Sequence, residues 1–229
     1  MYKRQAKYEA TTINDQETTV ITNTVNTTGN VSVYKELDKN DVYFSHGNPT
    51  FTFHLRGTDW KGNKLDLAKS VTYTEDDVKQ STGDKIRKEA IFPGVEMGTY
   101  TITESGMENL YQFNKVSTEG DNTRIGDDGK SAVITLGKDT TTGKFYATGT
   151  ATFYNTSIRG SIKIVKYEDD SKSKPLAGVT FSIADKDGKE IGTATTNKNG
   201  EINFTNLKRG KYTLKETKTV AGHSLLSKP

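Results

Sequence analysis

Short runs of alternating apolar and polar residues, separated by turn-forming residues, constrain the fold of this chain most strongly. Residues 178–217, GVTFSIADKDGKEIGTATTNKNGEINFTNLKRGKYTLKET, read as four strands joined by the turns DKDG, NKNG and KRG. Residues 50–64, TFTFHLRGTDWKGNK, read as a strand and a turn, and no long amphipathic helix is evident. Because side chains alternate between the two faces of a strand, the apolar residues of each run lie on one face and can form a core. The sequence therefore predicts an all-β protein built of sandwiches.

Composition narrows the function classes. The 229 residues suffice for one large domain or two modest ones, and a hydrophobic content of 31% suits sheets with much solvated surface. The 32 basic and 29 acidic residues are interspersed, which argues against nucleic-acid binding, and no apolar run is long enough to span a membrane. Cysteine is absent, which excludes disulfides, thiolate metal sites and a thiol nucleophile.

One lysine occupies a position where an apolar residue would be expected. In NVSVYKELD (30–38), strand alternation places Lys35 on the same face as Val31 and Val33. Burying an ammonium group without a partner is costly, so an inward lysine calls for a partner on another strand.

Internal repeats indicate where such partners lie. GNVSVYKELD (29–38) and GSIKIVKYED (160–169) share a glycine followed six residues later by lysine. GTYTITES (98–105) and GKYTLKET (210–217) share an inward glutamate, Glu104 or Glu216. VITNT (20–24) and TFYNT (152–156) share an inward asparagine, Asn23 or Asn155.

The three inward residues of the middle stretch can react with one another. Desolvation favours the neutral forms of a lysine amine and a carboxylic acid, and proximity lets a proton pass between them. The neutral Lys35 amine then attacks the Asn155 carbonyl while Glu104 polarises it and shuttles protons, so that ammonia leaves and an amide joins Lys35 to Asn155. The alternative is an ordinary Lys35–Glu104 ion pair, with Asn155 as a hydrogen-bonded amide.

The order and spacing of these motifs resemble tandem Cna-B-type (SpaA-like) domains of Gram-positive surface adhesins and pilins. The resemblance rests on VSVYKELD, YTITES and TFYNT in one stretch, and on SIKIVKYED, GVTFSIAD and YTLKET in the next. It implies immunoglobulin-like β-sandwiches in which Lys35 bonds to Asn155 and Glu104 is the catalyst. In the following domain it implies that Lys166 is the crosslinking lysine and Glu216 the catalyst, with the acceptor missing. It also implies that Asn23 is an acceptor whose lysine is missing.

The same resemblance suggests a division of the chain. Residues 1–28 would be the last strand of a preceding Cna-B-like domain, 29–157 a complete domain with long insertions, and 158–229 a second domain that ends before its last strand. The insertions are expected around 75–90 and 105–147. The polar stretch TEDDVKQSTGDKIRKEA (74–90) is interpreted as a solvated connection, with a helical turn as the alternative.

The implied function is structural: a stalk or shaft module of a cell-wall-anchored, extracellular adhesin or pilin, with neighbouring domains of the same surface protein as partners. The alternative is that the domains themselves bind a host matrix protein through the insertions. A turnover enzyme is not expected, because the Lys35–Asn155 reaction happens once per molecule.

Other candidate sites are weak. The histidines His46, His54 and His223 lack metal-ligand spacing, and no metal or cofactor is expected. DKDGKE (185–190) lacks the full ligand set of a calcium loop and is interpreted as a hairpin turn. Trp60 and the 11 tyrosines are expected to serve mainly in packing.

Overall fold

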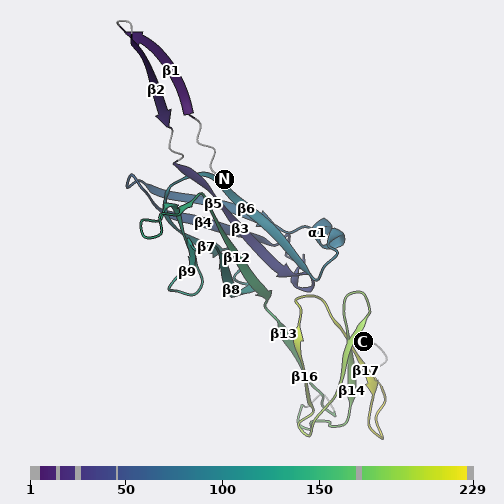
Figure 1. Ribbon diagram of the computed structural model, residues 1–229. Helices are drawn as coiled ribbons and strands as arrows, with labels where there is room; N and C mark the ends of the chain where they lie inside the picture. The colour runs from purple at the N-terminus through teal and green to yellow at the C-terminus, as the bar shows by residue number, and fades with distance from the viewer. Residues whose placement is uncertain (1–5, 14–15, 24–26, 45, 169–171, 226–229) are drawn as a thin grey trace.

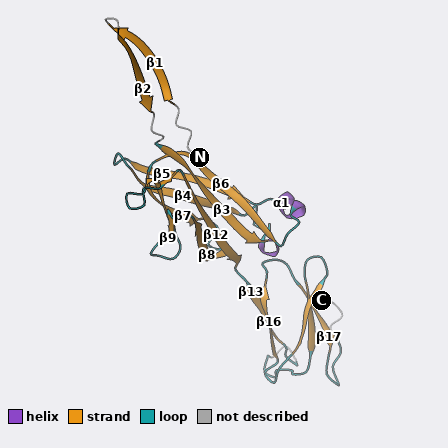
Figure 2. Ribbon diagram, viewed as in Figure 1, coloured by secondary structure: helices purple, strands orange, loops and turns teal. Residues whose placement is uncertain are grey.

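The computed structural model describes residues 6–13, 16–23, 27–44, 46–168 and 172–225, and for residues 6–23 it describes the backbone alone. Strands and the loops between them make up nearly all of this part of the chain (Figure 2). The strands are β1 (Ala6–Ile13), β2 (Gln16–Asn23), β3 (Thr28–Asp38), β4 (Thr50–Asp59), β5 (Lys64–Thr72), β6 (Lys85–Glu96), β7 (Gly98–Ser105), β8 (Tyr111–Glu119), β9 (Thr123–Ile125), β10 (Ala132–Lys138), β11 (Phe145–Tyr146), β12 (Thr148–Ser157), β13 (Gly160–Val165), β14 (Thr180–Ala184), β15 (Glu190–Thr195), β16 (Glu201–Leu207) and β17 (Thr213–Lys218). The helices are the 3-10 turn η1 (Lys39–Asp41) and α1 (Glu75–Gln80).

Strands β3 to β12 form a first sandwich. One sheet has the order β6-β3-β12-β8, and the other has the order β11-β10-β7-β4-β5 with β9 beside β10. The inward side chains of both sheets form one hydrophobic core, which includes Val31, Val33, Phe53, Ile102 and Phe153. The predicted all-β, sandwich-type fold is therefore confirmed.

The first and last strands of this sandwich are neighbours. β12 runs parallel to β3, with Val33 opposite Ala151 and Lys35 opposite Phe153. The other edge of β3 pairs antiparallel with β6. The close fit of β12 depends on Gly149, since a Cβ at that position would lie 2.3 Å from the Ile134 side chain of the facing sheet. Two strands about 120 residues apart in sequence thus share one ladder.

The prediction of a solvated connection over residues 74–90 is wrong for much of that stretch. Thr74 and Asp77 form a capping box that starts α1, which is the helical turn given as the alternative. β6 then begins at Lys85, with Ile86 and Ala90 buried in the core. The outward Lys85, Arg87 and Glu89 hide this alternation, because they make the stretch polar in composition.

Strands β13 to β17 form a second, smaller sandwich. β13 pairs with β16, and the facing sheet has the order β15-β14-β17. The four strands predicted between residues 178 and 217 are β14, β15, β16 and β17. The core includes Val179, Phe181, Ile183, Ile202 and Phe204. Among the described residues β13 has β16 as its single strand partner, so its other edge is open.

The two sandwiches and an N-terminal hairpin follow one another along the molecule (Figure 1). The hairpin consists of β1 and β2, paired antiparallel with Ala6 opposite Asn23. The sequence predicts a single strand in this region, whereas the structure has two. That residues 1–28 end a preceding domain stays a prediction, as do the other two domain boundaries.

The joint between the sandwiches is held by a buried carboxylate. Asp41 of η1 accepts hydrogen bonds from the backbone N (3.3 Å) and Oγ (2.8 Å) of Ser157, at the end of β12. It also forms an ion pair with Arg159, which lies between β12 and β13. A further bond links the backbone N of Ile158 to the carbonyl of Leu110 at 2.8 Å. The linker is therefore fastened to the first sandwich along its whole length.

Candidate functional site

Lys35, Glu104 and Asn155 meet inside the first sandwich. Lys35 and Asn155 lie on the neighbouring strands β3 and β12, and Glu104 faces them from β7 in the opposite sheet. Lys35 Nζ is 2.9 Å from Glu104 Oε2, and Asn155 Nδ2 donates to Glu104 Oε1 at 2.5 Å. One carboxyl group thus bridges the amine and the amide. The sequence predicts that these three residues meet, and the structure places them together.

The Lys35 amine is unusual in its surroundings. The residue is 0% exposed, and its Nζ lies 4.4 Å from the centre of the Phe51 ring. Burial lowers the pKa of Lys35 to about 8, although the nearby Glu104 carboxylate acts in the opposite direction. The amine therefore gives up its proton to a neighbouring base more readily than an ordinary lysine does, which favours its nucleophilic form.

Asn155 is held at one end of its amide and unbound at the other. Its Nδ2 contacts Glu104, whereas its buried Oδ1 has no hydrogen-bond partner among the described residues. The bulge between Tyr154 and Asn155, where β12 shifts register against β8, marks the same position. A buried carbonyl without a donor lacks the stabilisation that an ordinary structural amide has.

This arrangement suits amide exchange between side chains. Glu104 contacts both the nitrogen that would attack and the nitrogen that would leave, so one group can accept a proton from the first and deliver it to the second. The hydrophobic core around Lys35 keeps water away from the amine.

Two aromatic residues at this site were not singled out from the sequence. Phe51 covers the Lys35 amine, and the Tyr73 hydroxyl donates to the Lys35 carbonyl at 2.8 Å. The alternation of TFTF (50–53) signals that Phe51 and Phe53 face inward. Nothing local in the sequence signals that Phe51 lies over a lysine, because β3 and β4 lie in different sheets.

The second sandwich repeats two of the three groups. Lys166 Nζ lies 3.3 Å from Glu216 Oε2. Glu216 lies opposite Phe181 on the neighbouring strand of the same sheet, just as Glu104 lies opposite Phe53. Glu216 is buried, but the Lys166 side chain is 22% exposed. Neither Glu216 oxygen makes a hydrogen bond of good geometry within the described chain. No described residue stands where Asn155 stands in the first sandwich.

Asn23 is not brought to either pair. It is the last residue of β2, in the N-terminal hairpin, and its side chain lies outside what the structure describes.

The remaining candidates serve the fold. Asp185 accepts backbone hydrogen bonds from Asp187 and Lys189, which makes DKDGKE the predicted hairpin turn. His54 contacts Ser105 and Arg56 on the outer face of its sheet. Across the described residues, no group of three or more potential ligands could hold a metal ion.

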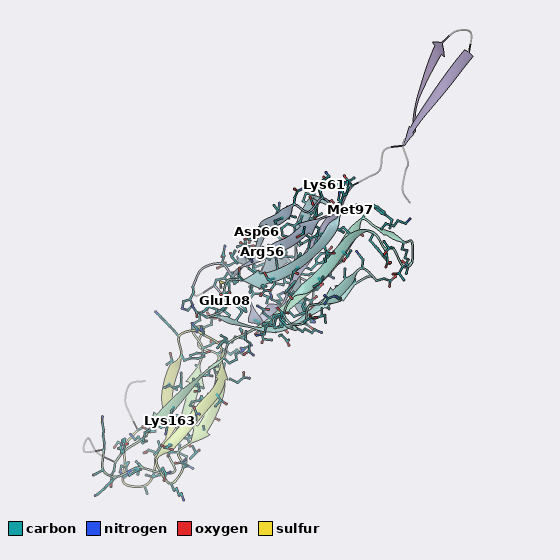
Figure 3. All side chains as sticks on the ribbon, turned by 90° about the vertical axis from the view of Figure 1, so that its left-hand side faces the viewer. Arg56, Lys61, Asp66, Met97, Glu108 and Lys163 are labelled. Carbon is teal, nitrogen blue, oxygen red and sulfur yellow. The ribbon has the colours of Figure 1, made fainter. Side chains whose placement is uncertain are left out.

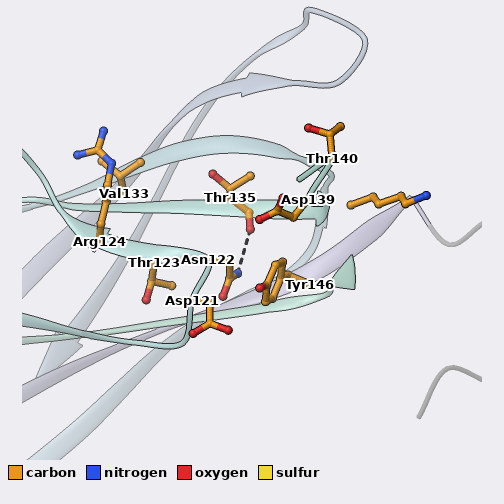
Figure 4. A pocket seen from close by; sticks show the side chains of 10 residues that line it. Asp121, Asn122, Thr123, Arg124, Val133, Thr135, Asp139, Thr140 and Tyr146 are labelled. Atoms are coloured by element: carbon orange, nitrogen blue, oxygen red, sulfur yellow. Dashed lines mark hydrogen bonds between the residues drawn. The ribbon is translucent and has the colours of Figure 1, made fainter. Parts of the chain in front are cut away.

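A polar hollow of about 340 Å³ lies at the β10 end of the larger sheet (Figure 4). Its principal polar groups have partners within the chain. Asn122 donates to the carbonyls of Thr135 and Thr148 at 2.9 Å, and Asp121 is paired with Lys144 at 2.6 Å. These contacts fasten the loop before β9 to β10, to the start of β12 and to the β10–β11 loop.

Comparison with known proteins agrees with this fold. Residues 160–229 match the SpaA family, a domain of prealbumin-like fold. The chain is 27% identical over 158 residues to serine-aspartate repeat-containing protein D of Staphylococcus aureus (strain Newman), covering 65% of this chain and 11% of that protein. It is 26% identical over 213 residues to the trypsin-resistant surface T6 protein of Streptococcus pyogenes serotype M6, covering 85% and 38% respectively. The chain therefore spans well under half the length of these curated relatives.

Among solved structures, the Bacillus anthracis TIE protein superposes with a TM-score of 0.56 at 16% identity, covering 96% of this chain and 37% of that one. This likeness concerns the fold. The architecture defines tandem immunoglobulin-like β-sandwiches. Residues 160–229 are similar to SpaA domains, and a larger part of the chain is similar to the staphylococcal and streptococcal proteins named above.

Within the described residues, no helix has both the length and the apolar character needed to cross a membrane.

Proposed function

We propose that the chain is a stalk or shaft module of a cell-wall-anchored adhesin or pilin, and that an isopeptide bond between Lys35 and Asn155 reinforces its first sandwich. The observation that carries the proposal is the buried contact of Glu104 with both Lys35 and Asn155. An ordinary ion pair would not need a buried asparagine whose Oδ1 has no hydrogen-bond partner among the described residues.

The reaction proceeds within the folded sandwich. A proton moves from the Lys35 ammonium to Glu104, and the neutral amine attacks the side-chain carbonyl carbon of Asn155. The C–N bond to Nδ2 breaks as Glu104 returns the proton to that nitrogen, and Glu104 then takes the second proton of the attacking nitrogen. One amide forms, one amide is lost, one ammonia leaves, and Glu104 ends protonated. No oxidant, metal or external nucleophile is required.

The bond would change how the module bears load. β3 and β12 are parallel neighbours, so opposed pulls on the two ends of the first sandwich shear them past one another. A Lys35–Asn155 bond passes this load from β3 directly into β12 and leaves the intervening residues unloaded. A chain without cysteine, and hence without disulfides, gains covalent reinforcement in this way.

Intact-mass spectrometry tests the proposal. The folded wild-type protein is expected to be lighter than its sequence by one ammonia, about 17 Da, while Lys35→Ala and Glu104→Gln have their full masses. Lys166→Ala is the matched control and should still lose one ammonia. Tandem mass spectrometry of a tryptic digest should find the peptides that contain Lys35 and Asn155 joined. A full-mass, well-folded wild type would overturn the bond.

The alternative is that these domains themselves bind a host matrix protein. The large exposed hydrophobic side chains of the described residues, such as Trp60, Ile91 and Ile125, come from different strands and turns of the first sandwich. Because these side chains are not drawn from one segment, they favour the stalk over a matrix-binding surface. A pull-down of matrix proteins with the purified chain would decide between the stalk and the matrix-binding adhesin.

A further inference from the structure

A groove of about 810 Å³ lies at the joint between the two sandwiches. One wall comes from the first sandwich, where Val42, Tyr43 and Phe44 follow η1 and Val78 lies on α1. The other wall comes from the second sandwich, through the β14–β15 and β16–β17 turns. The volume is within the range of sites that hold small ligands or a few peptide side chains.

The floor of the groove is apolar and firmly held. Tyr43, Phe44 and Val78 are half-buried and pack on the core of the first sandwich, each with surface left over. The Tyr43 ring stacks on Tyr111 with centroids 5.6 Å apart, and its hydroxyl donates to the Leu110 carbonyl at 3.1 Å. The floor is therefore preformed, which lowers the entropic cost of binding.

The two walls are also tied together. Arg209, in the β16–β17 turn, donates to the Asn109 carbonyl of the first sandwich at 2.7 Å. The bonds of Asp41 to Ser157 and Arg159 hold the linker beneath the same joint. The groove is thus a built feature of the joint between the sandwiches.

The rim of the groove carries an excess of positive charge. Lys79, Lys186, Arg209 and Lys211 line it, with Glu75 as the one lining carboxylate in the described chain. Lys79 is paired with Glu75 at 3.2 Å, and Lys186 with Asp187 at 2.8 Å. Arg209 and Lys211 have no carboxylate partner within salt-bridge distance among the described residues, so two cations remain uncompensated beside an apolar floor.

We propose that this groove binds an acidic peptide segment of a partner protein, with an apolar side chain on the floor and flanking carboxylates on Arg209 and Lys211. Charge complementarity selects the acidic segment over a neutral or basic one, and the exposed faces of Tyr43, Phe44 and Val78 select an apolar side chain between the acids. Because the ligand contacts both sandwiches, its binding also restricts their relative motion. The proposal goes beyond the stalk function and does not depend on the Lys35–Asn155 bond.

The test uses the whole chain and three capped peptides of sequence Gly-Asp-Phe-Glu-Leu-Gly, Gly-Asn-Phe-Gln-Leu-Gly and Gly-Lys-Phe-Lys-Leu-Gly. Titration followed by backbone amide NMR should give saturable shifts for the acidic peptide, centred on residues 42–44, 78–79 and 209–211. Affinity should fall about tenfold for the neutral peptide and further for the basic one, and should weaken with added salt.

Two matched variants locate the site. Lys211→Glu, at an exposed turn, should weaken binding of the acidic peptide by about tenfold, whereas Lys64→Glu, at an exposed position on β5, should leave it within about twofold. Val78→Ser should weaken binding without altering the salt dependence. Equal binding of the acidic and basic peptides, no saturable binding, or equal effects of Lys211→Glu and Lys64→Glu would overturn the proposal. The ammonia deficit should persist in Lys211→Glu, so this test and that of the crosslink fail independently.

Discussion

The two sandwiches place the same lysine–glutamate pair in different surroundings. In the first, Lys35 is 0% exposed and Glu104 contacts an asparagine from β12. In the second, the Lys166 side chain is 22% exposed, and the preceding strand β13 has an open edge in the described part of the chain. The two glutamates occupy equivalent positions, since Glu104 and Glu216 each lie opposite a phenylalanine on the neighbouring strand of the same sheet.

The strand that separates the two cases is β12. It covers the edge of β3, places Phe153 beside Lys35 and brings Asn155 to Glu104. Ile162 and Ile164 on β13 are only partly buried, because no described strand covers them. The difference teaches that a lysine and a glutamate on facing sheets are not enough. Only the covering strand removes the amine from water and brings an asparagine to the pair.

The largest expected difference between the sandwiches is in stability. Glu104→Gln should abolish the crosslink, which closes a loop of about 120 residues and stabilises by about 4 to 5 kcal/mol in the chain-entropy model. Glu216→Gln should change the free energy of unfolding by about 1 kcal/mol, because Lys166 keeps access to water. Thermal unfolding followed by calorimetry, with the mass of each variant recorded, measures both. Equal losses of unfolding free energy in the two variants would show that a crosslink does not stabilise the first sandwich.

A second expected difference is the pH dependence of bond formation. The reactive state holds one proton on the Lys35–Glu104 pair, and raising the pH through about 8 removes that proton as Lys35 deprotonates. The rate should therefore be flat near neutral pH and fall about tenfold per pH unit above about 8. Refolding unreacted, denatured chains at a series of pH values and following the loss of ammonia gives this profile. A rate that instead rises through pH 8 to a plateau would mean that the ionised carboxylate suffices.

The joint offers a third, smaller effect. Asp41→Asn keeps the shape of the side chain but removes the charge that holds Arg159, and we expect a loss of about 2 kcal/mol in the first sandwich. The second sandwich should keep its stability, while NMR relaxation should report faster relative motion of the two units. Unchanged relaxation would show that the other contacts of the linker suffice to hold the joint.

The smallest effects are expected where the sandwiches do not differ. Arg56 pairs with Asp66 at 3.0 Å on the first, and Lys163 with Glu201 at 2.6 Å on the second (Figure 3). Both pairs are solvent-exposed in part, so Arg56→Ala and Lys163→Ala should each cost less than about 1 kcal/mol. Denaturant titration provides the measurement, and a larger loss in either variant would point to packing of the side-chain stem.

Much of the fold was predictable because strand alternation is a local signal. The inward positions of Lys35, Glu104 and Asn155 follow from a period of two within their own short runs, and the turns of the second sandwich follow from Asp, Asn and Gly spacing. β6 was missed because its outward lysine, arginine and glutamate outweighed Ile86 and Ala90 in the composition of the stretch. The groups that surround the site, Phe51 and Tyr73, carry no local signal of their role.

The sequence by itself determined an all-β chain, the repeat of lysine and glutamate, and which three polar residues of the middle stretch face inward. Only the tertiary structure decided that β12 lies parallel to β3, that Glu104 reaches both nitrogens, and that Asp41 and Arg209 tie the sandwiches around a groove. The reason is the range of the interactions. Alternation depends on neighbours along one strand, whereas these contacts join residues about 50 to 120 positions apart and depend on how the two sheets pack.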